Sequence, residues 1–134
     1  MASIFTKIIN GEIPCYKVAE SADFIAFLDI NPNAKGHTLV VPKKEENKLF
    51  ELDETSYLGL MTFARKVAIA LEKVVPCERV GVSVIGLEVP HVHVHLIPLH
   101  SMKDIDFKHK VSLTSEEFSE LANTISEVFL ASES

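Results

Sequence analysis

The stretch from residue 91 to residue 97 decides the fold, and it reads His91-Val92-His93-Val94-His95-Leu96-Ile97. Polar and apolar residues alternate along it, which is the period of a strand whose two faces meet different surroundings. The three imidazoles therefore share one face of a strand predicted over residues 91–99. The valines and Leu96 occupy the other face, which is typical of a core, so the histidine face needs a separate explanation.

Further strands are predicted on the amino-terminal side of this one. Residues 79–85 form a strand-like run, and only residues 86–90 separate it from the histidine stretch. Because so short a link joins neighbouring strands, we expect the two to pair antiparallel. Residues 16–20 and 24–29 predict a hairpin, and residues 37–41 form another β-branched run.

Helical patterns fill the rest of the chain. Apolar residues recur at helical spacing within residues 4–9, and an apolar stripe with the same period runs through residues 53–75, where Asp53 is placed to cap the first turn. Thr114 to Glu117 form a capping box before a last helix predicted over residues 114–131. The sum is a single α+β domain over residues 1–134. It has about five antiparallel strands, one long central helix, and helices at the amino and carboxyl ends.

Composition narrows the function classes. The 134 residues are 47% hydrophobic and 24% charged, with a formal net charge of -6, so no basic surface predicts a nucleic-acid partner. We expect no membrane partner, because no apolar run approaches the roughly 18 residues of a membrane span and the first residues lack a signal-peptide core. Cys15 and Cys77 lie far apart, which favours free thiols in a reducing compartment and a cytoplasmic location.

Three interpretations of the histidine face compete: a solvated surface, a metal site, and a site of covalent catalysis. Alternate residues of a strand lie roughly 6.6 Å apart, so the first and third imidazoles start about 13 Å apart at Cα. Zinc needs its nitrogens within about 2.1 Å, so two neighbouring histidines can reach one ion but all three hardly can. A central nucleophilic imidazole flanked by two donors to a phosphate uses all three positions, and we favour this interpretation.

The histidine stretch resembles the His-φ-His-φ-His-φ-φ signature of the histidine-triad family of nucleotide hydrolases and transferases, where φ is an apolar residue. Upstream blocks resemble the family's pattern in the same order, and the resemblance covers about residues 4–98. These blocks are Ile4-Phe5, Lys7-Ile8-Ile9, Gly11-Glu12-Ile13-Pro14, Phe27-Leu28-Asp29-Ile30 and Gly36-His37-Thr38-Leu39-Val40-Val41-Pro42-Lys43-Lys44. The resemblance implies a HIT-like fold and a homodimer that binds a purine nucleotide.

The resemblance also implies roles for individual residues. His93 takes the position of the nucleophile that attacks the α-phosphate, with the carbonyl of His91 holding its other ring nitrogen. His95 takes the phosphate-contacting position, and His91 and His37 complete the catalytic cluster. Asp29 takes the place of the carboxylate that accepts hydrogen bonds from the ribose hydroxyls. The other residues expected to bind nucleotide are the apolar walls Phe5, Ile8, Phe27 and Ile30, together with Ser83, Gly86 and Val89.

Two departures from the family pattern bear on the chemistry. Leu87 and Glu88 stand where relatives commonly carry polar residues that touch the phosphate, and neither suits that contact. Several relatives hold a structural zinc through a CxxC and downstream histidines, whereas this chain has Ser3, Thr6 and Glu45 at the matching places. We therefore expect no metal site and no cofactor.

The substrate implied by the resemblance is a purine nucleoside phosphoramidate, an acyl nucleotide or a dinucleoside polyphosphate. It would be cleaved at the α-phosphate through a nucleotidyl-histidine intermediate. Two alternatives stay open. One is a nucleotide-binding or scaffold protein with vestigial catalysis, and the other is a metal-dependent hydrolase that uses two of the three histidines.

Overall fold

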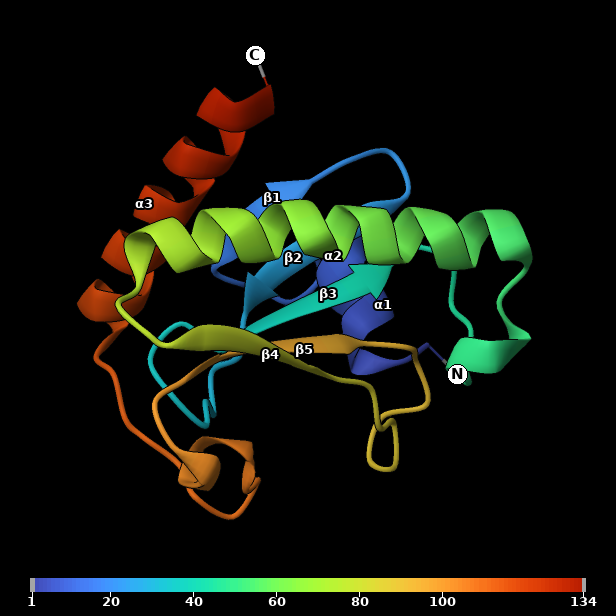
Figure 1. Cartoon of the computed structure of the whole chain (residues 1–134). Coiled ribbons are helices and arrows are strands. Elements are labelled where there is room, and N and C mark those ends of the chain that lie inside the picture. The colour runs from blue at the N-terminus through green and yellow to red at the C-terminus, as the bar shows by residue number, and fades with distance from the viewer. Residues whose placement is uncertain (1, 134) are drawn as a thin grey trace.

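The computed structural model describes residues 2–133, which fold into one antiparallel sheet with helices on both of its faces (Figure 1). The five strands lie in the order β1-β2-β3-β5-β4, and every neighbouring pair is antiparallel. Their bounds are β1 Lys17–Glu20, β2 Phe24–Leu28, β3 Thr38–Pro42, β4 Arg79–Ser83 and β5 Val94–Leu99. The α+β class expected from the sequence is confirmed.

The strand predicted over residues 91–99 is wrong at its start, because β5 begins only at Val94. The amide of Val92 donates to the carbonyl of Glu46 at 2.7 Å, and the amide of His91 donates to Val89, so neither joins the ladder. Pairing with β3 begins where Val94 lies opposite Val40. The alternation survives this change, since Val92 and Val94 are buried in the main core while the histidines lie apart from it.

The helices follow their predicted positions. Helix α1 spans Ile4–Ile9, and helix α2 spans Glu54–Val74 with Asp53 accepting from the amide of Ser56 as its cap. Helix α3 spans Ser115–Glu133, slightly longer than predicted, and the capping box is present in both directions between Thr114 and Glu117. Two short 3₁₀ helices, η1 at Leu49–Glu51 and η2 at Met102–Ile105, were not predicted.

The two faces of the sheet bury different clusters. Helices α2 and α3 cover one face, where Val40, Val94 and Leu96 pack against Leu60, Leu71 and Ile125 in the main core. Helix α1 covers part of the other face, where Phe5 packs with Phe27 and other residues of β2 and β3 in a smaller cluster. Figure 1 shows α2 crossing in front of the sheet, with α1 behind it. The histidines belong to the α1 face.

Gly36 sets the chain direction just before His37. Its φ of +95° lies in the region that side chains disfavour, and an added Cβ would lie 2.9 Å from Cγ2 of Val75. The backbone therefore passes close to the end of α2 and enters β3 only because this residue has no side chain.

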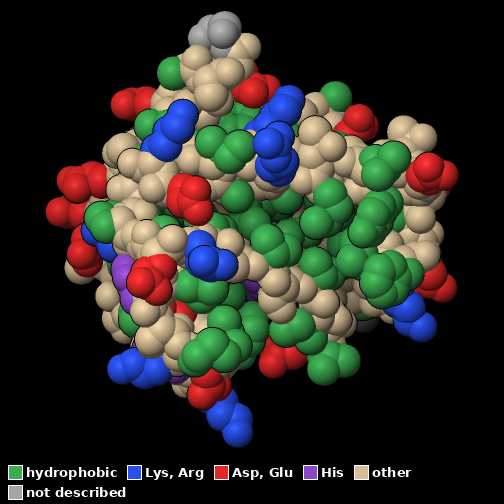
Figure 2. All heavy atoms as spheres, viewed as in Figure 1, with side chains coloured by type: hydrophobic (Ala, Val, Ile, Leu, Met, Phe, Trp, Pro, Cys, Tyr) green, Lys and Arg blue, Asp and Glu red, His purple; other side chains and the backbone are tan. Residues whose placement is uncertain are grey.

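Several large hydrophobic side chains remain exposed on the face that carries α2 and β4. Figure 2 shows hydrophobic atoms gathered over the middle and right of this face. The exposed residues include Leu58 and Ile69 on α2, Val82 on β4, and Ile85 and Phe50 near it. Along residues 2–133, none of the helices combines the length and apolar character that crossing a bilayer requires.

Candidate active site

Four histidines meet on the α1 face of the sheet. His91 and His37 are fully buried, and His93 and His95 are each 7% exposed. His37 immediately precedes β3, His95 lies in β5 opposite Leu39 of β3, and His91 and His93 lie in the irregular segment that leads into β5. The spacing of the sequence motif and the pairing of two strands together bring all four rings to one place.

His93 has one ring nitrogen held and the other free. Its Nδ1 lies 2.7 Å from the carbonyl oxygen of His91, which can only accept, so Nδ1 carries the proton. The lone pair is therefore on Nε2, and the side chain of His93 lines the cavity described below. The ring of Phe5 packs edge-on at 4.9 Å between centroids and limits its rotation. An imidazole held in this way is arranged as a nucleophile.

A directed chain of hydrogen bonds runs through His37 to His95. The amide of Asn33 donates to Nδ1 of His37 at 3.0 Å, so the proton of the neutral His37 ring is on Nε2. That Nε2 lies 2.9 Å from Nδ1 of His95 and donates to it. The neutral His95 ring consequently carries its own proton on Nε2, where it is available to donate to a bound ligand.

The rings of His37 and His95 are both neutral near pH 7. Burial, with a smaller contribution from neighbouring positive charge, lowers the pKa of His37 to about 3 and the pKa of His95 to about 4. Oδ2 of Asp29 lies 3.6 Å from Nε2 of His37, a separation typical of ion pairs. Because the ring is uncharged, this contact is not an ion pair. Burial raises the pKa of Asp29, and this effect outweighs the opposing hydrogen bond from the amide of Asn31 and the positive charge of Lys110.

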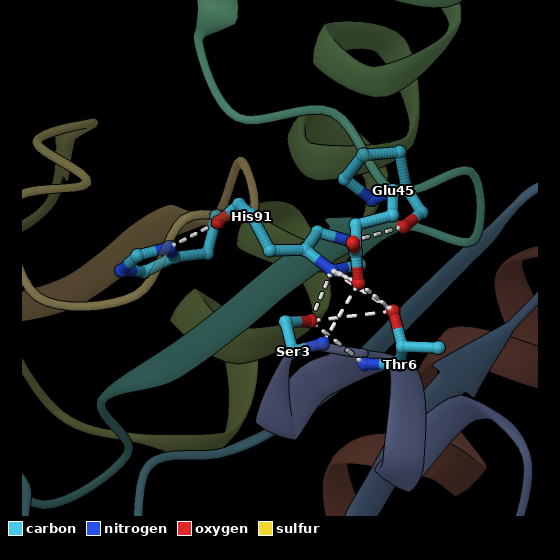
Figure 3. A network of polar contacts seen from close by, with 6 residues as sticks. Ser3, Thr6, Glu45 and His91 are labelled. Atoms are coloured by element: carbon cyan, nitrogen blue, oxygen red, sulfur yellow. Dashed lines mark hydrogen bonds and ion pairs between the residues drawn. The ribbon is translucent and has the colours of Figure 1, made fainter. Parts of the chain in front are cut away.

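His91 is fixed by a second network that reaches helix α1 (Figure 3). Its Nε2–H donates to the carbonyl of Pro42 at 2.8 Å, and its Nδ1 accepts from the Ser3 hydroxyl at 2.7 Å. Glu45 accepts from the Ser3 amide at 2.8 Å and from the Thr6 hydroxyl at 2.5 Å. These hydrogen bonds lower the pKa of Glu45 to about 2, and the one from the Thr6 hydroxyl has the largest effect. The network ties α1 to the residue whose carbonyl orients His93.

A cavity with two lobes opens at His93 and His95. The inner lobe, about 330 Å³, lies between α1, β2 and the 88–89 segment, and the outer lobe, about 350 Å³, lies toward residues 85–88. Both lobes share six lining residues, which are Asn31, Glu88, His93, His95, Phe107 and Lys110. A ligand that fills both lobes would thus pass directly across the two imidazoles.

Most of the predicted nucleotide-binding residues line this cavity. The inner lobe is lined by Phe5, Ile8, Phe27, Asp29, Ile30 and Val89, and the outer lobe by Gly86. Ile30 lies at the rim, with 73% of its surface exposed. Ser83 lines neither lobe and instead pairs opposite His95 in the β4–β5 ladder.

Two residues that line both lobes, Phe107 and Lys110, were not predicted from the sequence. The Phe107 ring lies 4.9 Å from the His95 ring, and Nζ of Lys110 lies 5.3 Å from the centre of the Phe107 ring. Both come from the irregular segment after η2, which has no hydrophobic period to predict its placement. An aromatic residue and a lysine close together just after the histidine motif were the only available signal.

Three potential metal ligands also meet here, a group that the motif spacing does not predict. One ligand atom each from Asp29, His37 and His95 lies within 4.8 Å of the others. The hydrogen bonds do not fit a cation, however. A metal on Nε2 of His37 would move the ring proton to Nδ1, which already accepts from the amide of Asn33. The two N–H groups would then face each other.

A family model described as the HIT domain matches residues 10–102 of the chain. The chain belongs to the histidine-triad, or HIT, family. It is 38% identical over 132 residues to a HIT-like protein of Borreliella burgdorferi, covering 92% of this chain and 95% of that one. It is 43% identical over 100 residues to the adenosine 5'-monophosphoramidase of Schizosaccharomyces pombe, covering 73% of this chain and 74% of the relative.

Solved structures of HIT proteins share this fold. A Hit-like protein of Bartonella henselae superposes with a TM-score of 0.81 at 32% identity, over 94% of this chain and 95% of that one. A histidine triad nucleotide-binding protein of Sulfolobus tokodaii gives 0.81 at 30% identity, over 95% and 91%. The family predicted from the histidine stretch and its upstream blocks is thereby confirmed.

Proposed function

We propose that this HIT protein hydrolyses purine nucleoside phosphoramidates at the α-phosphate through a covalent intermediate on His93. The observation that carries the proposal is the bond from Nδ1–H of His93 to the carbonyl of His91, which leaves Nε2 with its lone pair at the junction of two lobes. The similarity to two yeast adenosine 5'-monophosphoramidases, at 43% and 39% identity, supports this choice of substrate over an acyl nucleotide or a dinucleoside polyphosphate.

The inner lobe, hereafter the nucleoside lobe, suits a purine nucleoside. Phe5, Phe27 and Ile8 offer an apolar slot for a flat base, and Asp29 lies in the same lobe with its side chain 19% exposed. Hydrogen-bond donors stabilise a partly buried carboxylate. A ribose supplies two hydroxyl groups, and the two oxygens of the carboxylate can accept a hydrogen bond from each. Ribose binding would therefore replace part of the hydration that Asp29 has lost.

The reaction has two steps. Nε2 of His93 forms a bond to the α-phosphorus while the phosphorus–nitrogen bond breaks. The leaving nitrogen departs as an amine with a proton taken from solvent, which the attacking water returns to solvent in the second step. Nε2–H of His95 donates to a non-bridging phosphate oxygen during the first step. Water then attacks the same phosphorus, releases the nucleoside monophosphate and returns His93 to its starting state.

Rapid quenching of the protein with adenosine 5'-phosphoramidate tests the proposal. We expect intact-mass spectrometry to find one adenylyl group per chain on His93 early in turnover, and chromatography to find free AMP later. Exhaustive chelation should leave the rate unchanged, which separates covalent catalysis from a metal-dependent hydrolase. Tight AMP binding with no turnover of any phosphoramidate would instead favour the scaffold alternative.

We further propose that the protein forms a homodimer through the open edge of its sheet. Strand β4 ends the strand order, and among residues 2–133 no other strand pairs with its outer edge. Val82 of β4 is 58% exposed and lies among the exposed apolar residues of the α2 face. A second copy would pair with this edge around a two-fold axis and cover the apolar residues in the same contact.

The variant Val82→Lys is expected to weaken self-association more than about tenfold, because a two-fold axis brings two new like charges together in a buried strand edge. Light scattering after size-exclusion chromatography would show a dimer for the wild type and a monomer for the variant. Leu130→Lys is the matched control, since Leu130 is 63% exposed on α3 and lies outside the proposed contact. A monomeric wild type at about 100 μM, far above the dissociation constant of stable dimers, would refute the dimer.

A further inference from the structure

Residues 106–111, which follow η2, form one wall of the cavity and are held in place by hydrogen bonds near both ends of the segment. The buried side chain of Asp104 accepts from the amides of His100 at 2.7 Å and Ser101 at 3.1 Å. The carbonyl of Asp104 accepts from the side-chain amide of Asn33 at 3.0 Å, and the amide of Val111 donates to Pro32 at 3.0 Å. The segment is thus attached at both ends to the loop that orients His37.

Lys110 is held in this wall by uncharged groups. Its Nζ donates to the carbonyl of Asn31 at 3.0 Å and to the side-chain oxygen of Asn33 at 2.8 Å, and it lies over the Phe107 ring. An ammonium group has three N–H donors, and the described residues offer no partner for the third. Among the same described residues, no carboxylate forms an ion pair with Lys110, so no bound counter-charge neutralises its ammonium group.

This charge acts where the reaction would occur. Lys110 lines both lobes together with His93 and His95, and it is the only lysine or arginine among the described residues that lines either one. Its positive charge contributes to the lowered pKa values of His37 and His95 and opposes the raised pKa of Asp29, which places it within electrostatic reach of all three.

The opposite side of the outer lobe cannot serve the same purpose. Leu87 is 90% exposed and has no side-chain donor, and Glu88 brings a negative charge to the lining of both lobes. An α-phosphate at the junction would therefore be repelled from the 87–88 side. Among the described residues that line the two lobes, a full positive charge comes only from Lys110, beside the N–H donor of His95.

We infer that Lys110 is a further phosphate ligand of this site besides His95, binding a non-bridging oxygen of the α-phosphate and stabilising the charge that develops there as His93 attacks. The inference rests on the proposed function and adds to it the source of positive charge. It also explains how the chain binds an anion although residues 87 and 88 have lost the polar groups common in relatives. The chemistry recognised is a nucleoside phosphate, and an uncharged nucleoside gains nothing from this contact.

Calorimetric titrations with AMP and with adenosine test this role. We expect Lys110→Met to weaken AMP binding by about tenfold or more, the scale of one charge-assisted contact, while adenosine binding stays unchanged. Unchanged adenosine binding also shows that the variant is folded. Lys110→Arg should keep most of the preference for AMP, and kcat with adenosine 5'-phosphoramidate should fall more than about tenfold in Lys110→Met.

Lys108→Met is the matched control, because it removes the same charge from the same segment at an exposed residue that lines neither lobe. It should bind both ligands like the wild type. If the wild type prefers AMP to adenosine and Lys110→Met keeps that preference, the role of Lys110 is refuted while the proposed function stands. If the wild type binds neither ligand, the proposed function itself fails, and this inference fails with it.

Discussion

His93→Ala is expected to lower kcat for adenosine 5'-phosphoramidate by at least about 10⁴-fold, the scale seen when a covalent nucleophile is removed. No neighbouring ring can replace it. Nε2 of His91 is bound to Pro42 and its Nδ1 to Ser3, and Nδ1 of His95 accepts from His37. Steady-state release of AMP, measured by chromatography, gives the rate, and quenched samples of the variant should contain no adenylyl adduct.

His100→Ala is the control for this experiment, because it also removes an imidazole close to β5 but from an exposed position that lines neither lobe. Its rate should match that of the wild type. AMP binding should survive in His93→Ala, since the nucleoside lobe and Lys110 are intact. A variant that still turns over within about tenfold of the wild-type rate would disprove covalent catalysis on His93.

The free energy of unfolding is expected to fall as the pH drops from about 6.5 to about 4, by on the order of 5 kcal/mol. The pKa values of His37 and His95 in the folded protein are about 3 and about 4. In the unfolded chain both imidazoles regain a pKa of about 6.5. Within this window the unfolded state binds more protons, so stability rises with pH and is lost as the pH falls. The raised pKa of Asp29 opposes this loss near pH 4.

Urea titrations followed by circular dichroism across this pH range measure the effect. His95→Gln removes one of the buried imidazoles whose pKa is lowered and should flatten the dependence, whereas His100→Gln should leave it as in the wild type. Equal stability of the wild type at pH 6.5 and pH 4 would contradict the neutral, buried state of the His37–His95 chain.

Much of the fold is predictable because its signals are local. Helix α2 follows from a long apolar stripe and a capping aspartate, and α3 from a capping box, all within a few residues of each other. The early start predicted for β5 was wrong for a non-local reason. The amide of Val92 binds Glu46, 46 positions earlier, and no periodicity in the histidine stretch reveals this partner.

The site residues also divide into those that local sequence signals or the family resemblance predict and those placed by contacts distant in the sequence. His91, His93 and His95 lie together because of spacing, and His37 and Asp29 were placed by resemblance. Phe107 and Lys110 reach the cavity only because Asp104 and Asn33 bind each other across 71 positions of the chain. Such contacts are set by tertiary packing, so their residues are visible only in three dimensions.

Main-chain groups orient three of the four histidine rings. The amide of Asn33 sets the proton of His37, the carbonyl of Pro42 sets that of His91, and the carbonyl of His91 sets that of His93. A substitution changes a side chain but leaves the peptide group in place. The residues next to these rings can therefore change in sequence while each ring keeps its proton on the same nitrogen. Residues that line the cavity can also change, and with them the ligands that fit, while the orientation of these rings is preserved.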